Sequence, residues 1–327
     1  MRVLMISSEW PSDEHPNSGL FVKRQFDYLK KNGVNIEIYS FRGGGSLKNY
    51  WIHRRKIKST IKTFKPDIFH AQFAQSALLV VGRKGKLVVT YRGDDAQGIV
   101  NEKGVQTKKG LILMLIGKIV STVSDKIIVV SKHLLKKIPW ISDASVIPSG
   151  LELYRYDKLL KSDRASMREK LGIPPGFMIL FPNSTSNPNK NYQLVEQALA
   201  SVAINERKDF FVKTIFGQSH EELLQYMRAS DCMILTSLRE GSPNVIKEAM
   251  ALNTPIISVP VGDVPERISK LKGSFVSQGY DPQELANLMI KAKEFDYSEY
   301  NSRELVSLLD EQKLTEGLID IYHSLMN

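Results

Sequence analysis

Apolar and polar residues alternate along the first half of the chain in a pattern that predicts strands separated by helices. Short apolar runs bounded by polar loops indicate buried strands, and apolar residues three and four positions apart indicate helices that bury one face. The strands expected in this half are 2–7, 34–39, 68–70, 87–90, 126–130 and 144–147. Strands that alternate with helices favour a parallel, doubly wound α/β sheet.

The pattern changes near Ser149 and Gly150, where a charged connector begins, and a second alternating series starts beyond Lys170. Its expected strands are 178–181, 210–215, 232–235 and 255–259, and its expected helices are 192–203, 221–229, 243–251 and 311–325. The 327 residues are about twice the ~150 of a typical domain. We therefore expect an α/β protein of two Rossmann-like domains that face one another across a cleft. The expected bounds are 1–160, 161–305, and 306–327 for a last helix that packs back toward the N-terminal domain.

The composition is that of a globular protein, with 42% apolar and 24% charged residues, and it excludes disordered and fibrous chains. The single cysteine, Cys232, cannot form an internal disulfide, which favours a reducing compartment. The first residues lack the features of a signal peptide. The apolar run 111–123 is interrupted by Lys118 and is shorter than the ~20 residues of a membrane span, so we expect it to be a buried helix. These features predict a cytoplasmic protein.

The formal charge of +10 is unevenly distributed. Residues 1–150 hold 25 basic and 11 acidic residues, a net charge of +14, and the remainder carries a net charge of −4. Such asymmetry indicates a polyanionic partner, either nucleic acid, anionic lipid or a phosphorylated substrate. The densest stretch, 53–58, has the spacing of a basic helix face, which by itself is more typical of a solvated surface than of a binding site. No zinc-ligand spacing or RNA-binding motif is present, so we expect no nucleic acid and favour an anionic membrane surface.

The stretch 237–266 carries the most informative chemistry. A buried strand is followed by a Gly-Ser-Pro turn and an amphipathic helix, with Ser242 expected as the N-cap and Pro243 at the first helical position. The free N–H groups near Asn244 and Val245 form an anion site that the helix dipole strengthens. Gly241 lets the backbone approach a phosphate or a sugar closely.

Two carboxylates flank this turn, Glu240 before it and Glu248 within the helix. A carboxylate that leans back toward the helix start can accept two hydrogen bonds from a vicinal diol such as that of ribose. Phosphate-binding amides next to a diol-binding acid suit a nucleotide diphosphate-sugar. The alternative is a capped helix with two surface acids.

The same residues resemble a known family. Glu240 and Glu248 match the Glu-x7-Glu motif of the family 4 retaining glycosyltransferases, whose fold is the two-Rossmann GT-B architecture. The segment 146–152 resembles the interdomain segment of that family, and residues 10–25 are similar to a subgroup that builds bacterial surface polysaccharides. The resemblance extends over nearly the whole chain and is strongest in the second half.

The resemblance implies transfer of a sugar from a UDP- or GDP-linked donor to a lipid-linked or polysaccharide hydroxyl, with retention of configuration. It also implies an acceptor-binding N-terminal domain at the inner face of the cell membrane, a donor-binding C-terminal domain, and no metal or other cofactor. The catalytic residues that the resemblance implies are Lys190, Glu240 and Arg92. Lys190 matches the lysine that binds the donor phosphate, and Glu240 should hold the donor sugar. Glu248 should bind the ribose. The remaining site residues by resemblance are Gly241, Ser242, Asn244, Val245 and Ser184 on the donor side, and Gly19, His70 and Asp95 on the acceptor side.

Three departures from the family pattern affect the site. The usual Gly-Arg pair, whose arginine binds diphosphate, is Asn183-Ser184 here. The usual His-Gly-x-Asp loop is Arg92-Gly93-Asp94-Asp95, and Arg92 is either a catalytic cation or the partner of a neighbouring aspartate in a structural bridge. One strand–helix unit is missing between 207 and 231, so we expect a reduced second domain.

Three alternatives stay open at this point. His70 either lines the acceptor cleft or is a histidine whose ring is satisfied at a strand end. The adjacent pair Asp94-Asp95 is weak evidence for a metal motif, and we expect no metal. The chain could also be a catalytically silent scaffold that binds nucleotide-sugars, or a nucleotide-sugar epimerase of the same fold.

Overall fold

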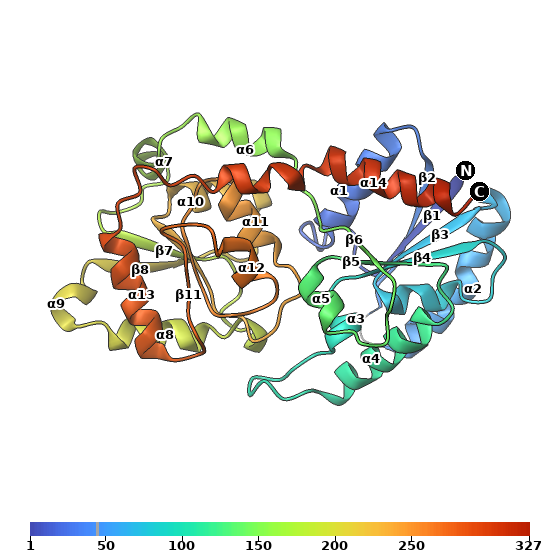
Figure 1. Ribbon diagram of the computed structural model, residues 1–327, viewed down its shortest axis with the longest axis horizontal. Coiled ribbons are helices and arrows are strands. Elements are labelled where there is room, and N and C mark those ends of the chain that lie inside the picture. Colours follow the sequence, from blue (N-terminus) through green and yellow to red (C-terminus); the bar gives the residue numbers. More distant parts are fainter. Residues whose placement is uncertain (44–45) are drawn as a thin grey trace. The chain divides into compact units, whose positions relative to one another are not determined.

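The computed structural model describes residues 1–43 and 46–327, without the side chains of Leu47 and Asn205 (Figure 1). The chain divides into two units. Unit 1 consists of Met1–Ile99, Gln106–Gly150 and Leu309–Asn327, and unit 2 of Val100–Val105 and Leu151–Leu308.

Unit 1 contains, in the described part of the chain, a six-stranded sheet in the order β2-β1-β3-β4-β5-β6, and every neighbouring pair is parallel. Its strands are β1 (Arg2–Ser7), β2 (Asn35–Ser40), β3 (Ile68–Gln72), β4 (Lys86–Tyr91), β5 (Lys126–Val129) and β6 (Ser145–Val146). Its helices are α1 (Leu20–Lys31), α2 (Leu47–Phe64), η1 (Ala74–Leu79), α3 (Asp94–Gln97), α4 (Lys108–Ser121), α5 (Lys132–Lys136) and α14 (Glu311–Ser324).

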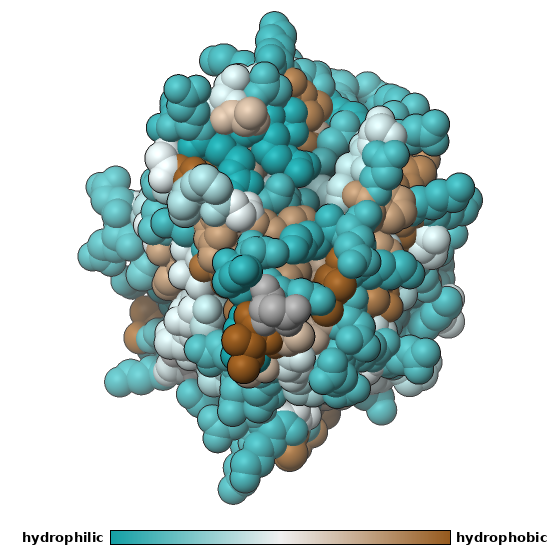
Figure 2. Space-filling view, turned by 90° about the vertical axis from the view of Figure 1, so that its left-hand side faces the viewer, coloured by the Kyte–Doolittle hydropathy of each residue, from teal (hydrophilic) through white to brown (hydrophobic). Residues whose placement is uncertain are grey.

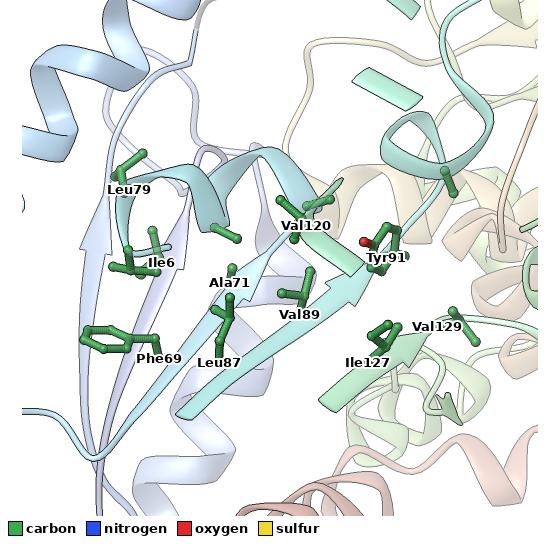
Figure 3. Packing of buried hydrophobic residues seen from close by; sticks show 14 of the residues in the cluster. Ile6, Phe69, Ala71, Leu79, Leu87, Val89, Tyr91, Val120, Ile127 and Val129 are labelled. Carbon is green, nitrogen blue, oxygen red and sulfur yellow. The ribbon is translucent and has the colours of Figure 1, made fainter. Parts of the chain in front are cut away.

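Alternate residues of each strand point to opposite faces of this sheet. Helices cover both faces, so both sets of side chains are buried. On β1, Leu4 and Ile6 belong to a core cluster that includes side chains of α2, η1 and α4. Figure 3 shows part of this cluster, with Val120 and Leu79 above the strands. Val3 and Met5 belong to the opposite cluster, which includes Leu318 and Tyr322 of α14. The last helix of the chain is therefore part of unit 1, where it packs on α1.

Unit 2 contains, in the residues described, a five-stranded sheet in the order β11-β10-β9-β7-β8, also parallel throughout. Its strands are β7 (Phe177–Phe181), β8 (Phe210–Thr214), β9 (Cys232–Leu235), β10 (Ile256–Ser258) and β11 (Phe275–Val276). Its helices are α6 (Leu153–Leu160), α7 (Arg164–Lys170), η2 (Pro188–Lys190), α8 (Tyr192–Ser201), α9 (Ile204–Arg207), α10 (His220–Ala229), α11 (Asn244–Ala251), α12 (Val264–Ile268), α13 (Pro282–Glu294) and η3 (Arg303–Leu309). The expected α/β fold with two parallel sheets is confirmed, and the strand β11 and the helices α6, α7 and α13 add to the predicted elements.

The prediction that 111–123 forms a buried helix is wrong. Leu111, Leu115 and Ile119 of α4 are 55%, 59% and 55% exposed. The helix instead buries Gly110, Gly117 and Val120. A β-carbon at Gly117 would collide with the backbone carbonyl oxygen of Asp95. The apolar character of α4 is nearly uniform around its axis, so the glycines, which allow close backbone approach, decide which face packs.

Matched glycine substitutions in two helices test this packing. Gly117→Ala should lower the free energy of unfolding of unit 1 by about 1–3 kcal/mol, because the added methyl group overpacks against rigid backbone. Gly317→Ala in α14 meets open space and should raise stability by up to ~1 kcal/mol through helix propensity. Denaturant unfolding can be followed by tryptophan fluorescence, since Trp10, Trp51 and Trp140 all lie in unit 1. Equal effects of the two substitutions would contradict the assignment of the packed face.

Candidate functional site

Three loops of unit 2 meet at the carboxyl edge of its sheet. They follow β7, β9 and β10, which are neighbours in the order β10-β9-β7, and parallel strands end at the same edge. Hydrogen bonds fasten the first loop to the second: the Leu238 amide donates to the Asn189 carbonyl at 2.8 Å, and the Thr236 hydroxyl donates to the Lys190 carbonyl at 2.9 Å. The loops therefore form one connected surface.

Two of the predicted catalytic residues contact each other on this surface. The Lys190 Nζ donates to Glu240 Oε1 at 2.6 Å. Lys190 ends η2, and Asn191 follows it in the left-handed region with φ 52°, which turns the chain into α8. Both side chains are mostly buried, with 22% of Lys190 and 15% of Glu240 exposed. A charged pair in this partly shielded position is pre-aligned next to the start of α11.

The start of α11 lies one residue later than predicted. Pro243, with ψ 124°, is the N-cap, and the helix begins at Asn244. The expectations that Ser242 caps the helix and that Pro243 is its first residue are therefore both wrong. Ser242 Oγ donates instead to Asp263 Oδ2 at 2.8 Å, and Arg267 also contacts that carboxylate. This contact fixes the Gly-Ser-Pro turn against the loop after β10. The first amides of α11, which include those of Asn244 and Val245, have no partner within the helix and present the positive end of its dipole.

Glu248 lies one turn into α11 and is almost fully buried, with 6% of its side chain exposed. His220, the first residue of α10, places Nε2 at 2.9 Å from Glu248 Oε1. Sequence reasoning missed His220. The only sequence signal is Ser219, the N-cap of α10, whose hydroxyl accepts from the Glu222 amide. A helix that begins after Ser219 places His220 at the edge of the sheet.

Several buried polar atoms around these loops have no hydrogen-bond partner among the described residues. They include Asn183 Nδ2, Asn189 Oδ1, Ser237 Oγ, Asn244 Oδ1 and Asp263 Oδ1. Buried polar atoms are normally paired, and leaving one unpaired costs about 1–3 kcal/mol. Their gathering at the carboxyl edge fits a polar ligand with several hydroxyl and phosphate oxygens. Ser184 lies in the same region, in the exposed loop after β7, with its Oγ 2.8 Å from Ser186 Oγ.

Arg92, the third predicted catalytic residue, lies in unit 1 after β4. Its Nε donates to Gln72 Oε1 at 3.1 Å, and its Nη1 donates to Ser149 Oγ at 2.9 Å. The guanidinium also stacks on the Phe21 ring at 4.6 Å. Burial lowers the pKa of Arg92 to about 10, against the opposing effects of Asp95, Glu9 and Glu311, so the group stays charged at neutral pH. The side chain is thus held in place by neutral partners.

Asp95 and Gly19 fix the backbone at the same edge of unit 1. Asp95 is fully buried and accepts backbone amides of Ala74, Arg92 and Gly93 at 2.9–3.0 Å. Burial raises its pKa, while these three amides and Arg92 lower it. Its carboxylate therefore braces the loop that carries Arg92. Gly19 has φ 65°, and a β-carbon there would collide with the Glu9 carbonyl, so only glycine fits at the start of α1.

His70 lies in the core, which favours the structural interpretation of this residue. It is 0% exposed, with Nδ1 at 2.6 Å from the Tyr322 hydroxyl and Nε2 at 2.8 Å from Thr90 Oγ1. Burial, with a smaller contribution from Arg92, lowers the pKa of His70 to about 3. The ring is therefore neutral and links α14 to the centre of the sheet.

Glu9 is a second residue that sequence reasoning missed. It follows β1 in the loop that touches Gly19, and burial raises its pKa although Arg92 and Arg42 lower it. An acid next to two arginines at the end of a central strand is a candidate for contact with a hydroxyl. No group of three or more histidine, cysteine or acidic residues in 1–43 and 46–327 is arranged to hold a metal ion.

Comparisons with known proteins show which families and relatives this chain resembles. A model described as Glycosyltransferase Family 4 matches residues 2–155, and one described as Glycosyl transferases group 1 matches residues 211–304. A Bacillus subtilis protein, TuaC, named as a teichuronic acid biosynthesis glycosyltransferase, is 25% identical over 83% of this chain and 84% of its own length. The N-acetyl-alpha-D-glucosaminyl L-malate synthase of Bacillus anthracis is 23% identical over 73% of this chain and 70% of its own length.

Solved structures agree on the fold. Sucrose-phosphate synthase from Thermosynechococcus elongatus has a TM-score of 0.80 at 16% identity, over 100% of this chain and 99% of that chain. The Anabaena protein HepE, in complex with UDP and glucose, has a TM-score of 0.70 at 15% identity, over 99% of this chain and 100% of that chain. The fold of both units is that of the GT-B glycosyltransferases.

The buried histidine gives a pH-dependent prediction. The pKa of His70 is lowered on folding from about 6.5 to about 3. Between these two pH values the imidazole is protonated in the unfolded chain and neutral in the folded chain. Its contribution to stability is complete above pH ~6.5 and falls by about 1.4 kcal/mol per pH unit below it. His70→Asn should remove this part of the slope between pH 6.5 and 5, measured by denaturant unfolding with tryptophan fluorescence. Parallel slopes for the two proteins would contradict the neutral, buried ring.

Proposed function

The chain belongs to the family 4 glycosyltransferases, and we propose that it moves a sugar from a nucleotide-sugar to a lipid-linked or polysaccharide hydroxyl with retention of configuration. The observation that carries the proposal is the Lys190–Glu240 pair at 2.6 Å beside the start of α11. Such a donor has a diphosphate, whose oxygen leaves in the reaction, and a sugar with hydroxyl groups. The Lys190 ammonium and the first amides of α11 suit the diphosphate and its leaving oxygen, and the Glu240 carboxylate suits the sugar hydroxyls.

In the proposed reaction the bond between the anomeric carbon and the diphosphate oxygen breaks, and a bond from the acceptor oxygen to the same carbon forms on the same face. The acceptor proton passes to the leaving phosphate, so no protein nucleophile is needed. Negative charge grows on the diphosphate, and Lys190 together with the amides of Asn244 and Val245 would stabilise it. Glu240 would hold the sugar, and Glu248 the ribose of a UDP- or GDP-linked donor.

The acceptor side is proposed for unit 1. Glu9 and Arg92 lie at the ends of β1 and β4, and the likeness to TuaC supports a surface-glycan acceptor. We place the enzyme at the inner face of the cell membrane, attracted by the basic charge of 1–150. Among the basic residues of α2, Arg54 donates to the carbonyls of Leu78 and Val81, so the attraction would come from the exposed residues Arg55, Lys56, Lys58 and Lys62.

Among the described residues, no helix has the length and apolar character needed to cross a bilayer. Peripheral attachment is therefore the form of membrane association that we propose.

A catalytically silent nucleotide-sugar-binding scaffold is the second candidate. The observation that favours it is Ser184, a neutral hydroxyl bound to Ser186 where the family pattern has a diphosphate-binding arginine. Thermal-shift screening against UDP- and GDP-sugars would identify the donor, because a ligand at 100 times its Kd stabilises by ~2.7 kcal/mol. Release of the nucleotide in the presence of an acceptor supports the transferase, and tight binding without turnover supports the scaffold.

Ribose recognition predicts a binding defect in unit 2. Glu248→Ala should weaken nucleotide binding by about 1.5–3 kcal/mol, through the loss of charge-assisted hydrogen bonds. His220→Asn should give a smaller loss, since His220 only orients the carboxylate at 2.9 Å. Glu221→Ala, an exposed acid of the same helix, is the matched control. Calorimetry on folded variants measures the effect, and wild-type affinity in Glu248→Ala would refute the assignment.

Metal independence predicts that turnover continues in EDTA. Lys190 and the amides at the start of α11 take the role that a divalent ion has in other enzymes that transfer sugars from diphosphates. Lys190→Ala should lower the turnover rate by at least tenfold, in line with the loss of one stabilising charge. The proposal fails if EDTA abolishes activity and manganese restores it.

A further inference from the structure

The exposed face of α4 has no role in the proposed reaction. Leu111, Ile112, Leu115 and Ile119 are 55%, 47%, 59% and 55% exposed, and their spacing places them on one side of the helix. The opposite side, with Gly110, Gly117 and Val120, packs on unit 1, where α4 contacts η1 and α3. The apolar face is therefore fixed in its outward direction by the glycine packing.

Basic residues frame this face. Lys108 and Lys109 form its first turn, Lys118 lies near its last turn, and all three are exposed. No acidic residue occurs between 108 and 121. Lysines at the margins of an apolar stripe can extend their ammonium groups to phosphates while their methylenes stay among acyl chains.

Helix α2, which covers the same face of the sheet as α4, carries an exposed aromatic and basic pair. Both α2 and α4 contact η1, and Ile57 of α2 and Val120 of α4 belong to one core cluster. Trp51 of α2 is 60% exposed, with the Arg55 guanidinium 4.0 Å from its ring centre. Tryptophan and arginine are typical of the headgroup region of bilayers.

We propose that α4 inserts its Leu111–Ile119 face into the interface of a bilayer that contains anionic phospholipid. The helix has 14 residues, about 21 Å, too short to cross the ~30 Å hydrocarbon core, so it would lie in the plane of the interface. A second copy of the chain fits less well. Four half-exposed aliphatic side chains expose on the order of a few hundred Å², less than the ~800 Å² per partner of a stable dimer, and the flanking lysines of two copies would repel each other.

This inference deepens the proposed membrane attachment and rests on it, but it does not depend on the transfer reaction. Charge attraction alone would be released by salt. Insertion of the α4 face adds an apolar contribution that salt does not screen. The two modes of attachment are therefore separable on the same protein.

The test is sedimentation with vesicles of phosphatidylcholine, with and without phosphatidylglycerol, at low salt and at about 1 M salt, where charges are screened beyond ~3 Å. Wild type should bind the anionic vesicles at low salt and keep a substantial bound fraction at high salt. Leu111→Gln/Leu115→Gln, which leaves the charge unchanged, should lower the partition constant by about tenfold or more and make binding fully salt-sensitive.

The matched control is Ile204→Gln/Phe216→Gln in unit 2, where the side chains are 83% and 70% exposed. Figure 2 shows the face on the left-hand side of Figure 1, where hydrophobic residues lie in separate areas among hydrophilic ones. This control should bind vesicles as wild type does. Unchanged melting temperatures would show that both double variants are folded.

Complete release of wild type by salt would overturn the insertion of α4 and leave the electrostatic attachment standing. An unchanged partition constant in the α4 variant would also overturn it, as would a dimer in analytical ultracentrifugation that only the α4 substitutions dissociate. No binding at low salt would overturn both forms of attachment. Turnover with a water-soluble acceptor, measured in parallel, is expected to be unchanged in the α4 variant and reports on the transfer reaction alone.

Discussion

The parallel pairing of β7 with β9 is the constraint on which the donor site depends. Ile179 and Leu180 pair with Cys232 and Met233, so the loops after the two strands leave the sheet side by side. Only because of this adjacency can Lys190, which follows β7, reach Glu240, which follows β9 and is 50 positions away in the chain. The polar loops can vary in sequence while the buried strands hold their ends in place.

In unit 1 the parallel strands also bring polar side chains together, and there these side chains bind one another. Polar side chains of β3 and of the loop after β4 form a connected network in which His70, Gln72 and Arg92 are neighbours. Tyr322 joins this network from the last helix through its 2.6 Å contact with His70. A fully satisfied network rigidifies its members. The last helix of the chain is thereby tied to the loop that carries Arg92.

Much of the fold could be predicted from the sequence because buried parallel strands are short, continuous apolar runs. The Glu-x7-Glu spacing also predicted a donor site at the loop around Glu240, and that assignment stays a prediction. The N-cap was misassigned because Ser-Pro fits a cap at either residue, and the competing hydrogen bond from Ser242 to Asp263 depends on a loop 21 positions away. His220 could not be found for a similar reason, since its contact with Glu248 requires the strand order of the folded sheet. The outward face of α4 follows from Gly110 and Gly117, and an apolar run alone does not reveal which side a helix buries.

The central claim is that the carboxyl edge of the unit 2 sheet binds the nucleotide-sugar. Hydrogen exchange followed by mass spectrometry, with and without a saturating nucleotide-sugar identified by thermal shift, measures this location directly. The account predicts slower exchange in peptides that cover 183–192, 236–250 and 260–267, because the ligand would hold these three loops and bind the first amides of α11. Protection confined to other segments, with these three unchanged, would contradict it.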